Sequence, residues 1–80
     1  MKNLKSHIVY VVTKSSTDNS IVKGDIVWLS VNGDLNLAQE RCWLTKAEWD
    51  VSGTNDFEVE ECRDYYLDVN NGYECVRQVG

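Results

Sequence analysis

Short blocks of hydrophobic residues alternate with polar turn residues along the chain, and this pattern predicts a small protein built mainly from strands. His7–Thr13 is rich in β-branched residues and predicts the first strand. Ile26–Val31 predicts the second strand, in which Ile26 and Trp28 share one face because side chains alternate along a strand. The polar segment Lys14–Ser20 predicts a loop between them.

The dipeptide Asn32-Gly33 predicts a hairpin. Asn-Gly is the strongest local hairpin signal, because a type I′ turn needs positive φ at both of its central residues. We therefore expect Ile26–Val31 to pair antiparallel with Asp34–Ala38 around a two-residue turn. The period of two residues then places Leu35 and Leu37 on one face, with Asn36 and Ala38 facing outward.

A short helix is predicted near residues 46–50. Thr45 precedes Glu48 by three residues, which is the spacing of a capping box. The leucine before Thr45 and the indole of Trp49 stand at the two positions of a hydrophobic staple. Segment 41–44 either extends the preceding strand or crosses over to this helix.

The C-terminal part of the chain also reads as strands. Phe57–Glu60 alternates apolar and acidic residues, as a strand with one buried face does. The segment 60–69 has two interpretations, a strand over Tyr65–Val69 or a helical turn near Glu60–Tyr66, and its aromatic residues favour the strand. Asn70-Asn71-Gly72 is a second hairpin signal and leads into the alternating segment Tyr73–Val79.

These elements predict a mainly β fold, with an α+β fold as the alternative, in a single domain spanning residues 1–80. Two architectures fit strands at such short spacing. The first choice is a partly open barrel, and the second is a small, curled antiparallel sheet packed on the short helix near 46–50.

One segment resembles a known architecture. In residues 23–37, "KGDIVWLSVNGDLNL", a Gly-Asp pair precedes a strand and a hairpin follows, which is similar to the start of an SH3-like small barrel. The resemblance implies an SH3-like barrel fold and assigns no binding residues. In general character the chain is also similar to short, acidic, uncharacterised proteins of bacterial mobile elements.

Aromatic residues are the first candidates for binding. Hydrophobic residues make up 42% of the 80 residues, which argues against intrinsic disorder. Large rings supply much of the buried area in a small core, and we expect Trp28 and Trp49 inside. Three further aromatic residues are candidates for exposed anchors of a protein interface: Trp43, Tyr66 and Tyr73.

The negative charge gathers in the second half of the chain. The net charge is −5, and residues 41–80 carry all of it, with four basic residues against nine acidic ones. Such a surface repels phosphate, so direct nucleic-acid binding is disfavoured. The acidic stretch 56–68 is either a solvated sheet face or a surface for a basic partner, with three candidate binding residues: Glu58, Glu60 and Glu61.

Cysteine and histidine residues predict neither a metal site nor a catalytic centre. Cys42, Cys62 and Cys75 are odd in number and widely spaced, so we expect buried reduced thiols; a bridge from Cys62 to either of the other two is the alternative. No close Cys pair suits zinc, and His7 stands alone. The sequence holds no catalytic or phosphate-binding motif, so we expect no enzyme activity, no metal and no cofactor.

The functional expectation is a non-enzymatic, cytoplasmic protein-interaction or accessory module. No apolar run is long enough to span a bilayer, and no signal peptide is recognisable at the N-terminus. The expected partner is another protein, with no direct contact to nucleic acid or membrane. The alternative is an acidic inhibitor that mimics nucleic acid and binds a basic target protein. The oligomeric state is left open, since an exposed edge strand could pair with a second copy.

Overall fold

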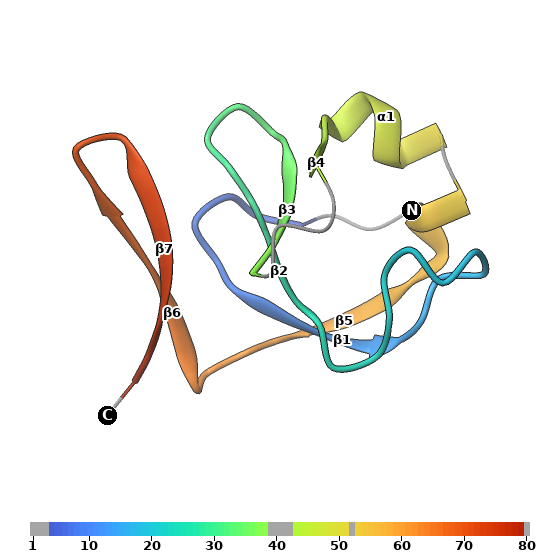
Figure 1. Ribbon diagram of the computed structural model, residues 1–80, viewed down its shortest axis with the longest axis horizontal. Helices are drawn as coiled ribbons and strands as arrows, with labels where there is room; N and C mark the ends of the chain where they lie inside the picture. Colours follow the sequence, from blue (N-terminus) through green and yellow to red (C-terminus); the bar gives the residue numbers. More distant parts are fainter. Residues whose placement is uncertain (1–3, 39–42, 52, 80) are drawn as a thin grey trace.

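The computed structural model describes residues 4–38, 43–51 and 53–79 and shows a mainly β protein (Figure 1). Seven strands, one short α-helix and one 3-10 helix follow one another along the chain. Their bounds are β1 Tyr10–Lys14, β2 Ile26–Leu29, β3 Leu35–Leu37, β4 Trp43–Leu44, α1 Lys46–Val51, η1 Gly53–Asp56, β5 Glu58–Glu61, β6 Tyr65–Asn70 and β7 Tyr73–Gln78.

The strands form two antiparallel sheets that are not closed into a barrel. Five strands make the main sheet, in the order β4-β3-β2-β1-β5, so that β4 and β5 are its edges. The other sheet is the hairpin of β6 and β7 alone. The structure therefore has the second of the two predicted architectures, the small antiparallel sheet packed on a short helix, and not the barrel that was the first choice.

One face of the main sheet carries the hydrophobic core. Alternate residues of the three central strands point to this side, and α1 and η1 lie against it. Trp49 of α1 and Phe57 after η1 are completely buried there, with ring centroids 6.0 Å apart. The other buried members of this cluster are Val12, Ile21, Val27, Leu29, Leu35 and Leu37.

The opposite face of the main sheet looks toward the β6–β7 hairpin. In Figure 1 the hairpin, in orange and red, stands on the other side of the sheet from α1. Trp28 pairs with Asn36, and Asn36 pairs with Trp43, so these three residues share this face. Trp28 and Asn36 are buried, which confirms the prediction for Trp28 but corrects the outward position expected for Asn36. Asn36 is covered because it lies between two tryptophans.

The β2–β3 hairpin forms as predicted, but around a different turn. The Ser30 amide donates to the Asp34 carbonyl at 2.9 Å and closes a three-residue loop, Val31–Gly33. Gly33 has φ 85°, whereas Asn32 is not among the described residues with positive φ. This is the three-residue hairpin loop whose last residue is left-handed, and not the type I′ turn that Asn32-Gly33 predicts.

The β6–β7 hairpin does use the type I′ turn. Asn71 has φ 51° and Gly72 has φ 83°, and Asn70 pairs with Tyr73 on either side of them. The strand interpretation of Tyr65–Val69 is confirmed, and the alternative helical turn near Glu60–Tyr66 is wrong. The six residues of β6 pair with the six residues of β7. The hydrogen bonds between these strands replace the local ones that a helical turn would have formed.

The predicted capping box starts α1. The Thr45 amide donates to Glu48 Oε2 at 2.9 Å, and the Glu48 amide donates back to Thr45 Oγ1 at 3.3 Å. The hydrogen bond from the Thr45 amide, with that from its hydroxyl, lowers the pKa of Glu48. Leu44 and Trp49 both pack into the core cluster, as a hydrophobic staple requires.

Two other expectations need correction. The first strand begins at Tyr10 and not at His7, because His7 adopts a φ of 69° that a strand cannot continue through. Cys62 is half-buried and Cys75 is exposed, and both are free thiols, so neither is the fully buried cysteine that was expected and no bridge joins them. Cys42, and residues 41–42 of the segment before α1, lie outside the described residues, while Trp43 and Leu44 extend the sheet by pairing with β3.

Candidate functional site

The outer face of the β6–β7 hairpin carries two of the three predicted aromatic anchors. Tyr66 lies opposite Arg77 and Tyr73 lies opposite Asn70, which places both tyrosines on the same face of the hairpin. The exposed fraction is 47% for Tyr66 and 76% for Tyr73. Both rings are therefore accessible on the side that faces away from the main sheet.

An ion pair lies on this face between the two tyrosines. Arg77 Nε donates to Asp68 Oδ2 at 2.6 Å, and this hydrogen bond raises the pKa of Arg77. Tyrosine and arginine are enriched in protein interfaces. We call the set Tyr66, Asp68, Tyr73 and Arg77 the outer hairpin face.

Trp43, the third predicted anchor, lies elsewhere. Its side chain is 61% exposed, but it projects from the edge strand β4 on the same side as Trp28. That side looks toward the inner face of the hairpin. The structure therefore brings Tyr66 and Tyr73 onto one surface and leaves Trp43 at the mouth of a groove.

The groove lies between the main sheet and the hairpin and has a volume of about 450 Å³. Half of its lining comes from the sheet and its vicinity and half from the hairpin: Ile26, Trp28, Ala38 and Trp43 on one side, and Tyr65, Glu74, Cys75 and Val76 on the other. Of the described residues in this lining, Glu74 is the single charged one.

Two polar atoms of the groove residues are buried without a hydrogen-bond partner in the described structure. They are the indole Nε1 of Trp28 and the carboxylate Oε2 of Glu74. An unsatisfied buried donor or acceptor costs about 1–3 kcal/mol. A molecule bound in the groove could supply partners to both atoms.

Sequence reasoning did not find this groove. The residue type of Trp28 predicts only that it lies in the core, and Glu74 is one of nine acidic residues in the second half of the chain. No local pattern links them, because residues about forty-six positions apart meet only when the hairpin folds back over the sheet. The alternation around Glu74 does predict which face of the strand it shares with Val76, but not what that face meets.

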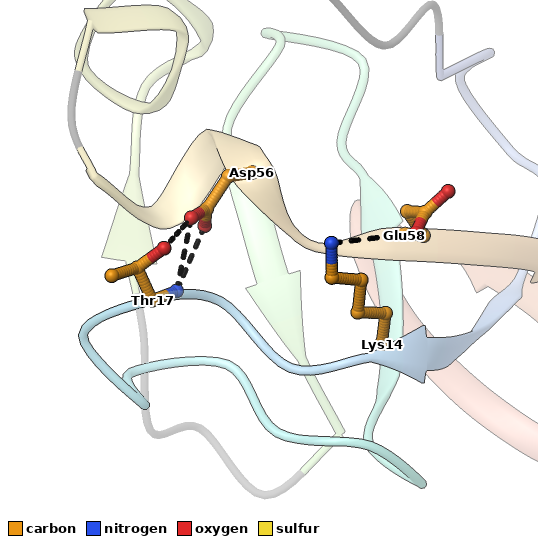
Figure 2. Close-up of polar contacts among 4 residues, drawn as sticks. All are labelled: Lys14, Thr17, Asp56 and Glu58. Carbon is orange, nitrogen blue, oxygen red and sulfur yellow. Dashed lines mark hydrogen bonds and ion pairs between the residues drawn. The ribbon is translucent and has the colours of Figure 1, made fainter.

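The three acidic candidates lie on β5, the edge strand beside β1. Glu58, Glu60 and Glu61 are all exposed. Glu58 Oε2 stands 3.9 Å from Lys14 Nζ, as Figure 2 shows. Glu60 and Glu61 pair in register with Val11 and Tyr10, and within the described ranges no ion pair neutralises either. Edge glutamates of this kind keep an exposed strand from pairing with another chain.

A nearby acid of the same stretch has a structural contact. Figure 2 shows Asp56 of η1 facing Thr17 of the loop after β1. The Thr17 amide donates to Asp56 Oδ1 at 3.0 Å and to Oδ2 at 3.1 Å, and the Thr17 hydroxyl also donates to Oδ2. Asp68 is likewise paired with Arg77. The acidic stretch is therefore not one uniform negative surface, since some of its members hold the fold together.

Metal-binding clusters are absent from the part of the chain that the structure describes. Nowhere in it do three His, Cys, Asp or Glu side chains gather closely enough to hold an ion. The same residues contain no helix with the length and apolar character needed to cross a membrane.

Comparison with known proteins places the chain in no family. No family model matches it, and no curated protein or solved structure is detectably similar. The resemblance of residues 23–37 to SH3-like barrels therefore stays a prediction, and the function has to be argued from the surfaces themselves.

Proposed function

We propose that this protein is a non-enzymatic interaction module of the cytoplasm that binds another protein through its outer hairpin face. The observation that carries the proposal is the exposure of Tyr66 and Tyr73 on one side of a hairpin, with the Asp68–Arg77 pair between them. Large rings around a hydrogen-bonded charge pair supply both area and orientation to an interface.

The hairpin itself supports the same function. Its two strands pair with each other and, within the described residues, with no strand of the main sheet. Backbone donors and acceptors along both outer edges can therefore pair with an extended segment of a partner. The partner contacts neither require nor involve nucleic acid or membrane.

The test is capture of a partner on the immobilised full chain from a nuclease-treated lysate of the native host. The bound material is washed at about 0.1 M and then about 1 M salt, which shortens the Debye length from about 10 Å to about 3 Å. An interface anchored by the tyrosines retains its partner in both washes. The double variant Tyr66→Ala/Tyr73→Ala loses it, since anchor residues contribute about 2 kcal/mol or more each.

The matched control is the variant Glu58→Lys/Glu60→Lys/Glu61→Lys, which leaves the hairpin unchanged and keeps the partner. The proposal is overturned if the partner is lost in high salt and in the lysine variant but is retained by Tyr66→Ala/Tyr73→Ala. That result supports the second candidate, an acidic inhibitor that binds a basic target protein through β5. The unneutralised glutamates Glu60 and Glu61 favour this alternative. Capture of no partner in either wash contradicts both.

A further inference from the structure

The groove between the main sheet and the β6–β7 hairpin has the size and lining of a small-molecule site. Its volume of about 450 Å³ falls within the range of about 300–1,000 Å³ that is usual for ligand pockets. Such pockets are lined mainly by apolar and aromatic side chains, with a few polar groups that orient the ligand. This groove has that composition, and it lies on the other side of the hairpin from the outer hairpin face.

Three aromatic side chains line the groove. Trp28 is only 7% exposed and stands at the floor, whereas Trp43 is 61% exposed and stands at the rim. Tyr65 contributes a half-buried ring from the hairpin. The faces of aromatic rings carry partial negative charge and attract cations, and tryptophan attracts them more strongly than tyrosine or phenylalanine does.

The charge of the lining points to the same class of ligand. Among the described residues that line the groove Glu74 is the single charged one, and its Oε2 is buried with no hydrogen-bond donor in reach in that same part of the chain. An anionic ligand would be repelled by this carboxylate, and a neutral apolar one would leave it unpaired at a cost. A protonated amine supplies both a positive charge and an N–H donor, which makes the strong, charge-assisted kind of hydrogen bond.

The second unsatisfied atom adds a requirement. Trp28 Nε1 carries a hydrogen that has no acceptor in the described structure. A ligand that satisfies it has a hydroxyl or carbonyl oxygen in addition to the ammonium group.

We propose that this groove binds a small organic ammonium ion, whose positive charge is held by the Glu74 carboxylate and the aromatic rings, and whose oxygen accepts a hydrogen bond from Trp28. The site is separate from the outer hairpin face and does not depend on the proposed protein partner. If the groove held only solvent water or a segment of a partner protein, it would show no preference for a cationic ligand over a neutral or anionic one.

The experiment compares three probes of nearly the same shape and different charge on the full chain. Tyramine is the cation, tyrosol is its neutral counterpart and 3-(4-hydroxyphenyl)propionate is the anion. Affinity is measured by calorimetry, and the indole N–H signal of Trp28 is followed by NMR. Tyramine is expected to bind at least about tenfold more tightly than tyrosol, which corresponds to about 1.4 kcal/mol. The anion is expected to bind most weakly, and tyramine to shift the Trp28 signal.

Two variants locate the effect. Glu74→Gln keeps the shape and removes the charge, and it is expected to abolish the preference for tyramine while leaving tyrosol binding unchanged. Glu61→Gln on β5 makes the same charge change on the core side of the main sheet, where Glu61 pairs with Tyr10, and leaves the preference intact. Trp43→Ala, at the exposed rim, weakens tyramine binding without loss of the native circular dichroism spectrum.

Equal affinity for the three probes, no binding of any of them, or an undiminished preference in Glu74→Gln would each overturn the proposal. The probe series on the unaltered chain decides the matter even where a variant fails to fold. None of these measurements involves the partner of the outer hairpin face, so failure here leaves that proposal standing.

Discussion

Asp56 connects two segments that are thirty-nine residues apart in sequence. Both of its carboxylate oxygens accept hydrogen bonds from Thr17, so η1 is attached to the loop that follows β1 (Figure 2). The sequence places Asp56 in a run of acids, where it looks like any other solubilising charge. Only the fold distinguishes it from the exposed acid Asp64, for which no side-chain contact is found in the described structure.

This distinction predicts different effects for two similar substitutions. Asp56→Ala is expected to lower the free energy of unfolding by about 1 kcal/mol, because it removes the hydrogen bonds that join Thr17 to η1, and the exposed Thr17 donors then bond to water. Asp64→Ala removes the same charge and is expected to change stability by no more than about 0.5 kcal/mol. Urea unfolding followed by tryptophan fluorescence measures both. Equal effects would mean that Asp56 acts only through its charge.

At the scale of the element, the same dipeptide makes two different turns. Asn71-Gly72 closes the β6–β7 hairpin with both residues in the left-handed region, at φ 51° and φ 83°. In the β2–β3 hairpin only Gly33 has a positive φ, and Ser30 and Asp34 close a longer loop. In the main sheet β2 and β3 each pair with a second strand, which constrains their connection, whereas β6 and β7 pair only with each other.

A matched pair of substitutions tests this difference. Asn71→Ala is expected to cost about 1–2 kcal/mol, because alanine is strained in the left-handed conformation that asparagine tolerates. Asn32→Ala is expected to be almost neutral, since Asn32 does not occupy that conformation. Thermal unfolding of the two variants gives the comparison. A larger loss in Asn32→Ala would show that the β2–β3 turn is type I′ after all.

The helix α1 illustrates an element that local sequence determines well. The Thr45–Glu48 capping box and the packing of Leu44 and Trp49 are both found where their spacing places them. All of the groups concerned lie within six residues, so no distant segment is needed to bring them together.

At the scale of the whole molecule, the main sheet has two unequal neighbours. On one side α1 and η1 cover a fully apolar cluster, in which Trp49 and Phe57 have no exposed area. On the other side stands the hairpin, and no residue of β6 or β7 is fully buried. A two-stranded hairpin with so little burial is held to the molecule by few apolar contacts.

Hydrogen exchange should therefore divide the molecule into two parts. Paired amides of β6 and β7 are expected to exchange at least about tenfold faster than those of β1 and β2, which is about 1.4 kcal/mol less in opening free energy. NMR-detected exchange under native conditions measures both sets in one sample. Equal protection across the two sheets would show that the hairpin opens only when the whole molecule unfolds.

Features that depend on neighbouring residues can be predicted from the sequence. The mainly β class, the helix at 46–50, the two hairpins and the burial of Trp28 and Trp49 all follow from alternation, turn residues and capping over short stretches. All three of Trp43, Tyr66 and Tyr73 are exposed, and their role as anchors stays a prediction. These features need only the geometry of single elements.

The tertiary structure alone decided which face of each element meets another. Asn36 was expected outside and is buried, because Trp28 and Trp43 flank it on a face that a later hairpin approaches. The groove exists for the same reason, since Trp28 and Glu74 belong to different sheets. Alternation assigns residues to two faces of a strand, but which of those faces meets solvent depends on contacts between segments far apart in the chain.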